Sequence, residues 1–332
     1  MGSHSSITTV GEAYAQFARD GALLRAGRQI INTPWMGARD SRMLPQTFEG
    51  VWGQFAPIKG LSLMATRVDA FKSRTSDGFN HDNLYYPNGY EDDQLYGTTT
   101  VFPKKAVLPE ASGALAIGAR YAAGPAHAQA WYYNFYDFAR TAYVDGGYTF
   151  GSKTQGFQPY VDAQYMHQTG GDVFVQYKAT LNGKGGAVNS TLWGLRGGVK
   201  FGGNNVSLAY NKLDDHADSF GGGALISPYG DYTAMYAAVM TANLLAYGPG
   251  NAAELAWTRW FLDKQVKFKA AALKFSTTYG GNPHAVYLDA SYFFQGKLKG
   301  LSVRDRLAMS NGAASAAYRS LVYNRLMLQY RF

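Results

Sequence analysis

Arginine is the residue in this sequence whose chemistry and spacing offer most to a ligand. Arginines and lysines stand singly along the chain, often between apolar neighbours, and seldom form runs. A guanidinium presents a planar fork that a carboxylate meets with two hydrogen bonds. Arginines spaced along one surface would therefore form a basic ladder of moderate anion sites, each passing a ligand to the next. The ladder candidates are Arg25, Arg67, Arg120, Arg196, Arg304, Arg306 and Arg325.

Catalytic chemistry has much less support in the sequence. The chain has no cysteine, which removes the thiol as a nucleophile and the thiolate as a metal ligand. His167 can be posed in a hydrolytic site with Asp162 or Ser190, but a solvated histidine at the end of a strand is the simpler interpretation. The sequence shows no phosphate-binding loop, dinucleotide fingerprint or metal-ligand cluster. We therefore expect no enzyme, no metal and no cofactor.

Elements with a period of two must position the arginines. Near the end of the chain, Leu326, Leu328 and Tyr330 alternate with Arg325 and Gln329, and other segments repeat the pattern. Successive side chains of a strand point to opposite faces, so each segment has an apolar and a polar face. About fifteen segments of about ten residues fit this pattern, a length suited to tilted membrane strands. They cover 8–18, 22–31, 47–57, 61–74, 113–123, 126–138, 142–151, 157–168, 191–202, 205–214, 252–263, 266–277, 284–296, 301–310 and 319–332.

The connections between these segments alternate in length, which is typical of outer-membrane barrels. Short turns such as Asp20-Gly21 and Gly203-Asn204 alternate with longer loops, notably 32–46, 75–112, 169–190 and 216–251. A soluble sandwich or solenoid is the alternative. The segments are long, however, and their polar faces repeatedly carry Arg and Lys, whose charge is costly unless it faces water, so we expect these faces to line an aqueous lumen. No apolar stretch approaches the about 20 residues of a membrane-spanning helix. We predict an all-β fold, an antiparallel transmembrane β-barrel that forms a single domain over 1–332.

Charge and the start of the chain bear on partners and location. The net charge of +8 suits anionic solutes, and the scattered basic residues argue against nucleic acid. Outer-membrane lipid is the other expected partner, and we expect a monomer or a weak oligomer. Residues 1–6 read like a tag, with neither a basic n-region nor an apolar h-region, and we therefore expect the signal peptide to be absent from this sequence. The expected location is the bacterial outer membrane.

Two long loops have compositions that suit a pore constriction. The 32–46 loop combines Arg39, Asp40 and Arg42 with Trp and Pro residues. The 216–251 loop is too apolar to extend into water and is expected to pack on the mouth of the barrel or inside it. For the 32–46 loop, composition alone does not choose between a constriction and an ordinary surface loop.

The stretch Arg39-Asp40-Ser41-Arg42-Met43-Leu44-Pro45-Gln46-Thr47-Phe48-Glu49-Gly50 resembles a motif of the OprD family, the substrate-specific outer-membrane carboxylate channels. Trp131-Tyr132-Tyr133-Asn134, Gln164-Tyr165 and Ser227-Pro228-Tyr229-Gly230-Asp231 are similar to further stretches of that family. The resemblance implies a barrel of about 18 strands with a basic ladder and an eyelet built by the third and seventh external loops. It also implies uptake of carboxylate-bearing solutes such as amino acids or aromatic acids.

On this mapping, 32–46 is the third loop and 216–251 the seventh. The implied eyelet candidates are Arg39, Asp40 and Arg42 together with Ser227, Tyr229 and Asp231. With about fifteen strands, the sequence is expected to lack roughly three N-terminal strands, and such a barrel would close poorly. The competing functions are a general or sugar-selective porin and, with less support, an outer-membrane barrel hydrolase.

Overall fold

The computed structural model describes residues 8–38, 44–74, 78–79, 113–151, 156–229, 233–314 and 319–331. Over these ranges the fold is all-β, as predicted, with a few short helices. The strands are β1 (Ala13–Arg19), β2 (Ala22–Gln29), β3 (Thr47–Ile58), β4 (Leu61–Lys72), β5 (Ala114–Ala123), β6 (Ala126–Phe135), β7 (Ala139–Thr149), β8 (Phe157–Gly170), β9 (Val188–Phe201), β10 (Asn204–Leu213), β11 (Gly250–Phe261), β12 (Val266–Thr277), β13 (Gly281–Phe293), β14 (Leu301–Ala313) and β15 (Ser320–Tyr330).

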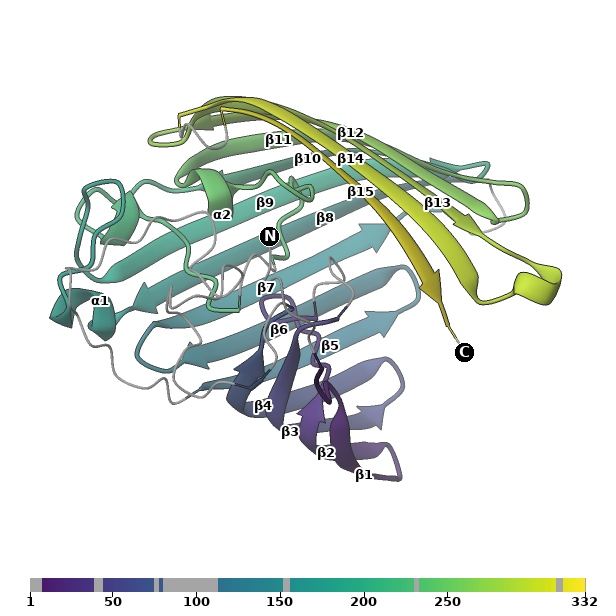
Figure 1. Cartoon of the computed structure of the whole chain (residues 1–332), viewed down its shortest axis with the longest axis horizontal. Coiled ribbons are helices and arrows are strands. Elements are labelled where there is room, and N and C mark those ends of the chain that lie inside the picture. The colour runs from purple at the N-terminus through teal and green to yellow at the C-terminus, as the bar shows by residue number, and fades with distance from the viewer. Residues whose placement is uncertain are drawn as a thin grey trace. The chain divides into compact units, whose positions relative to one another are not determined.

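The strands are hydrogen-bonded in their sequence order, from β1 through to β15 (Figure 1). The described strand pairs are antiparallel, so each strand joins the next without a crossover. Two compact units divide the chain: the first is Met1–Gly146, Tyr165–Thr191 and Asp214–Ala234, and the second is Gly147–Gln164, Leu192–Leu213 and Met235–Phe332. β1 to β6 belong to the first unit and β10 to β15 to the second.

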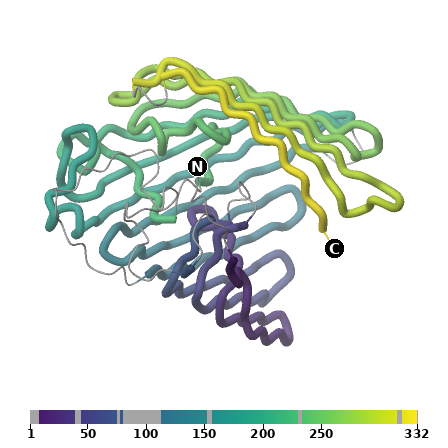
Figure 2. Tube along the Cα trace, in the orientation of Figure 1, coloured from purple at the N-terminus to yellow at the C-terminus, as the bar shows by residue number. Residues whose placement is uncertain are grey.

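The turns contain residues that tolerate a left-handed backbone. Asp20 and Gly21, which join β1 to β2, have φ values of 50° and 81°. Two successive positive φ angles give the turn that matches the twist of a hairpin, and Asp-Gly is a preferred pair for it. Between β3 and β4, a Cβ on Gly60 would lie 2.6 Å from the carbonyl oxygen of Ala122, so only glycine fits. Figure 2 follows the chain through these turns.

Strand β6 shows the two faces of the sheet in the first unit. Trp131, Tyr133 and Phe135 are buried, whereas Tyr132 between them is 41% exposed. The strand register extends both faces across the unit, because Tyr133 lies opposite Ala116, which in turn lies opposite Thr66. We call the face that carries Tyr133 the covered face of the first unit, and the opposite one its open face.

Strands β14 and β15 show the same division in the second unit. Leu326 and Leu328 are 72% and 71% exposed, while Ala308 and Ser310 are buried. Directly paired residues share a face, so Asp305 lies with Leu326, and Arg306 lies with Arg325 on the other side. We call the face of Arg306 and Ala308 the covered face of the second unit, and the face of Leu326 its open face. Exposed apolar side chains on a long sheet are what lipid contact requires.

The short helices are α1 (Asp172–Gln176) and α2 (Leu244–Tyr247), with 3-10 turns η1 (Phe220–Gly222) and η2 (Gly296–Leu298). None of the helices in the described ranges has the length and apolar character needed to cross a membrane. The predicted segment 266–277 coincides with β12, but 284–296 begins late relative to β13. The reason is a register irregularity between Gly281 and His284, where Gly-Asn-Pro looks like a turn yet continues the strand.

Candidate functional site

The 216–251 loop packs on the covered face of the first unit through an aromatic cluster centred on Tyr229. The ring of Tyr229 lies 5.1 Å from Phe48, 5.1 Å from Phe71 and 5.9 Å from Phe135, measured between ring centroids. All four side chains are buried. The cluster therefore fixes the chain at Tyr229 against strands β3, β4 and β6.

A second loop segment packs on the same face. The backbone N–H of Trp35 donates to the hydroxyl of Tyr133 at 3.3 Å, and the Trp35 ring meets Tyr143 edge-on at 6.0 Å. The Gln46 side chain then links both segments, because its amide donates to the carbonyl oxygens of Gly37 and Tyr229. The structure thus brings together parts of the two loops, 32–46 and 216–251, that the sequence singled out.

The structure describes only two of the six eyelet candidates. Arg39, Asp40, Arg42 and Asp231 lie outside the described residues. Ser227 and Tyr229 are described, and both side chains are almost fully buried. This packing corrects the expectation that their side chains contact a solute, since the Tyr229 ring is enclosed by aromatic rings and its carbonyl oxygen accepts from Gln46. These two residues hold the loop in place.

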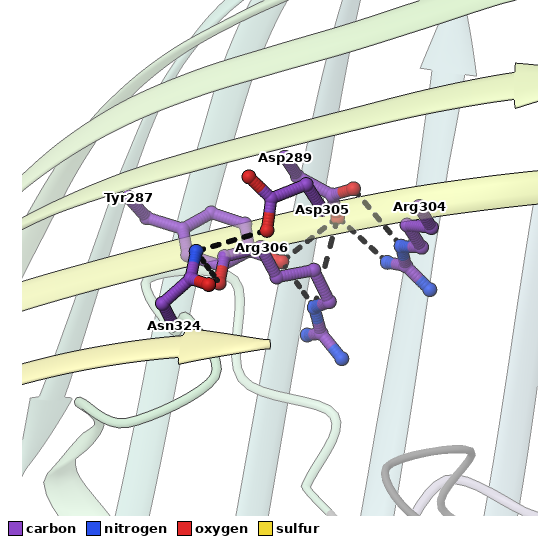
Figure 3. Close-up of polar contacts among 6 residues, drawn as sticks. All are labelled: Tyr287, Asp289, Arg304, Asp305, Arg306 and Asn324. Carbon is purple, nitrogen blue, oxygen red and sulfur yellow. Dashed lines mark hydrogen bonds and ion pairs between the residues drawn. The ribbon is translucent and has the colours of Figure 1, made fainter. Parts of the chain in front are cut away.

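In the second unit, charged residues form a row across neighbouring strands on the covered face. Arg325 of β15 lies directly opposite Arg306 of β14, which lies opposite Asp289 of β13, which lies opposite Lys269 of β12. Directly opposite residues have Cβ atoms about 5 Å apart. Arg304, two residues before Arg306 on β14, shares their face (Figure 3).

The arginines of this row have different partners. Arg304 binds Asp289 with both prongs of its guanidinium, Nε to Oδ1 at 2.9 Å and Nη2 to Oδ2 at 2.6 Å. The Nε of Arg306 donates to the hydroxyl of Tyr287 at 2.7 Å, and that hydroxyl donates to Asp289 at 2.8 Å. Arg325 donates from Nη2 to the hydroxyl of Tyr323. The hydrogen-bond partner of Arg304 is therefore charged, whereas those of Arg306 and Arg325 are neutral phenols. Arg306 also forms a longer ion pair with Asp289, Nε to Oδ2 at 3.9 Å.

Figure 3 also draws a polar pair on the open face of the same strands. The Asn324 side chain donates to Asp305 Oδ1 at 2.9 Å, next to the exposed leucines of β15. The alternation along β14 separates Asp305 from Arg304 and Arg306 on either side of it. Asp305 consequently takes no part in the charged row.

Arg196 and Lys269 also have acidic partners in the second unit. Arg196 Nε lies 2.8 Å from Asp162 Oδ2, and its guanidinium carbon lies 4.5 Å from the centre of the Tyr236 ring. Lys269 Nζ lies 3.1 Å from Glu254 Oε1. Both acids are buried while both cations remain partly exposed. The acids thus orient the cations without covering them.

Of the ladder candidates in the first unit, Arg25 and Arg120 lie on the covered face. Arg25 is opposite Trp52 and donates to Gln16 at 2.7 Å, and Arg120 is opposite Gln129, 3.5 Å from its amide oxygen. Arg120 is exposed and Arg25 is partly exposed. Their hydrogen-bond partners are neutral amides, and the guanidinium of Arg25 also lies over the Tyr14 ring.

Arg67 corrects the sequence prediction. It lies opposite Val51 and Leu115, on the open face, rather than with the other ladder candidates. There it pairs with Asp69 at 3.1 Å and lies over the ring of Tyr136. The covered face of β4 is filled at this level by Val68, which is fully buried, and leaves no wet space for a guanidinium.

Sequence reasoning missed Tyr287, Tyr323 and Glu254, which partner the basic residues. The signal that would have found the two tyrosines is spacing, because Tyr287 and Tyr323 stand two residues before Asp289 and Arg325 on the same strand face. His167 Nδ1 lies 3.2 Å from Thr191 Oγ1, a contact between neighbouring side chains that forms no catalytic set. Among the described residues, no group of three or more acidic or histidine side chains is placed to hold a metal ion.

Comparison with known proteins places this geometry in a family. A family model described as outer membrane porin, OprD family, matches residues 10–234. The structure of OccK3 (OpdO) from Pseudomonas aeruginosa is similar at 18% identity and a TM-score of 0.71, over 96% of this chain and 78% of that one. OpdK from P. aeruginosa, solved with vanillate, is similar at 17% identity and a TM-score of 0.71, over 96% and 77% of the two chains.

OccAB3 from Acinetobacter baumannii gives 17% identity and a TM-score of 0.71, over 96% of this chain and 76% of that one. A search of curated protein sequences finds no match. The family model covers most of the chain, and the fold agrees with it. The chain therefore belongs to the OprD family of outer-membrane porins, which are passive channels and not enzymes.

Proposed function

We propose that this porin carries small carboxylate-bearing solutes, such as amino acids or aromatic acids, by selective passive diffusion along a basic inner wall. The observation that carries the proposal is the pairing of Arg306 with Arg325 directly across two strands, each hydrogen-bonded to a neutral tyrosine hydroxyl. Like charges directly opposite each other destabilise a sheet. A sheet that keeps them gains an anion-binding surface in exchange.

The covered faces are the side of the sheet that suits a water-filled pore. In lipid, a charged side chain on the outward face costs about 2–4 kcal/mol near the bilayer midplane. The open face of β15 carries Val322, Leu326 and Leu328, all strongly exposed. The opposite face carries Arg304, Arg306 and Arg325, whose charge is tolerated where water reaches it.

Carboxylates fit this wall better than neutral solutes do. A guanidinium with a neutral partner retains its full charge and free N–H donors for a passing anion. The similar fold of OpdK was solved with vanillate, an anion of the class proposed here. On this proposal Arg39, Asp40, Arg42 and Asp231 form the eyelet, and Ser227 and Tyr229 hold its backbone through buried contacts.

Reversal potentials in planar bilayers test the proposal. Arg304→Ala, Arg306→Ala and Arg42→Ala are each expected to lower the preference for anions and to weaken block by carboxylates, because each removes a positive charge from the pathway. Arg67→Ala is the matched control, since Arg67 lies on the open face and its loss should leave selectivity unchanged.

An unchanged anion preference in both Arg304→Ala and Arg306→Ala would defeat the proposal. A general or sugar-selective porin predicts a different result for the wild type, namely a conductance that carboxylates do not block.

A further inference from the structure

One side chain of strand β8 holds the 216–251 loop with the hydrogen-bond pattern of a neighbouring strand. Gln168 on β8 donates from Nε2 to the carbonyl oxygen of Ile226 at 2.9 Å and accepts from the Ile226 N–H at 2.8 Å. A paired strand makes this double exchange with backbone groups. Here a single amide makes it with both polar backbone groups of one loop residue, and the contact is buried.

Further side chains fix the same segment on either side of Ile226. The hydroxyl of Ser190 on β9 donates to the carbonyl oxygen of Ala224 at 2.6 Å, and Gln46 donates to that of Tyr229 at 3.0 Å. Gln168 lies between these two anchors and is itself oriented by a contact to Thr141 Oγ1 at 2.9 Å. The segment Ala224–Tyr229 is thus held at three points, by Ser190 and Gln168 on strands and by Gln46 in the 32–46 loop, and Gln168 supplies the central one.

We propose that Gln168 is a positioning residue of the channel, one that sets where the segment Ala224–Tyr229 stands on the pore wall without touching the solute. The inference rests on the proposed function in one respect: the covered face is taken to be the inner wall of the channel. The aromatic cluster fixes the end of the segment at Tyr229, but apolar burial has no direction and does not set the position of the backbone at Ile226. The paired hydrogen bonds to Ile226 select one register and therefore one width of the passage.

The absence of cysteine allows a direct test by thiol labelling. Ala224→Cys introduces a thiol at a position that is 3% exposed. Gln168→Met keeps the side-chain length and removes both the donor and the acceptor of the amide. In this background the rate of labelling of Ala224→Cys is expected to rise about tenfold, because the buried N–H and carbonyl of Ile226 lose their partners. Open-channel current noise in potassium chloride should rise in parallel.

Two controls separate positioning from general loosening. Ala116→Cys on β5 is equally buried, and its labelling rate should not change in the Gln168→Met background. Gln54→Met, the same substitution on the covered face of β3, should leave labelling of Ala224→Cys unchanged. Thr141→Val, which removes only the contact orienting the amide, should give a smaller rise and serves if Gln168→Met does not assemble.

Equal labelling rates in the wild-type and Gln168→Met backgrounds overturn the inference, and so does a rise at Ala116→Cys as large as that at Ala224→Cys. Neither readout depends on which ion the channel prefers. A channel that lacked anion selectivity would refute the proposed function while leaving this test intact.

Discussion

At the scale of single residues, the hydroxyl of Tyr287 separates an acid from a base. It accepts from Arg306 at 2.7 Å and donates to Asp289 at 2.8 Å, while the direct distance from Arg306 Nε to Asp289 Oδ2 is 3.9 Å. Asp289 accepts two short hydrogen bonds from Arg304. The tyrosine hydroxyl therefore takes the short hydrogen bond from Arg306, whose ion pair with Asp289 is the longer contact, and the Arg306 side chain keeps 11% of its surface exposed.

Substitution of Asp289 tests how these charges are divided. Asp289→Asn is expected to raise the anion preference of the channel, because it removes the acid beside Arg304 and Arg306. It should also destabilise the protein by about 1 kcal/mol, since Arg304 loses its two-pronged partner but stays partly exposed to water. Reversal potentials and denaturant unfolding in vesicles measure the two effects.

Tyr287→Phe is the matched control for Asp289→Asn, since it removes a hydroxyl and leaves every charge of the cluster in place. Its effect on anion preference should be small by comparison. A lower anion preference in Asp289→Asn would show that the acid orients the arginines more than it neutralises them.

At the scale of the strands, alternation in the sequence predicted most of the sheet. The predicted segments correspond to the fifteen strands of the described ranges, because a face in contact with lipid requires an apolar residue at every second position. The predicted ends differ from the observed ones where glycine and polar residues continue a strand, as at the start of β13. Local pattern carries no information on such ends, which depend on pairing with the next strand.

Arg67 marks the limit of the same reasoning. Strand β4 has apolar residues on both faces, with Leu63 and Ala65 on one and Met64 and Val68 on the other. Period two distinguishes the faces only when one of them is polar. Because loop segments cover the inner side of the first unit, that side is apolar as well, and the choice of face for Arg67 could not be made from the sequence.

The loop contacts could not be predicted either. Trp35 meets Tyr133 and Tyr143, and Tyr229 meets Phe48 and Phe71, over separations of about a hundred residues or more for several of these pairs. Composition identified the loops as apolar or charged but not their partners. Such contacts follow from the shape of the wall, which exists only once the strands have paired.

A pair of substitutions on β10 tests the assignment of the two faces. Leu208, near the middle of the strand, is 63% exposed on the open face, and its neighbour Ser207 lies on the covered face. Leu208→Arg is expected to cost about 2–4 kcal/mol in lipid, because the guanidinium then faces hydrocarbon. Ser207→Arg should cost much less, since its charge reaches water. Unfolding of the two variants from vesicles compares them, and equal losses would contradict the face assignment.

At the scale of the whole molecule, the excess of positive charge attracts anions only where basic side chains are grouped on one face. The chain carries 31 basic and 23 acidic residues, a modest imbalance for its length. On the covered face of the second unit, however, Arg304 and Arg306 share the acid Asp289, and Arg325 lies directly opposite Arg306. A low-dielectric wall concentrates the field of such a group and raises the local concentration of anions.

This view predicts how selectivity depends on salt. Mobile ions screen charges over about 10 Å at 0.1 M and about 3 Å at 1 M ionic strength. If the field of the arginine row recruits the solute, the preference for carboxylates over cations should fall markedly between these two conditions, in reversal potentials measured on one channel. Arg306→Ala should flatten that dependence because it removes part of the field. A preference that is the same at both salt concentrations would mean that the shape of the eyelet selects the solute and that the row serves only to keep the wall wet.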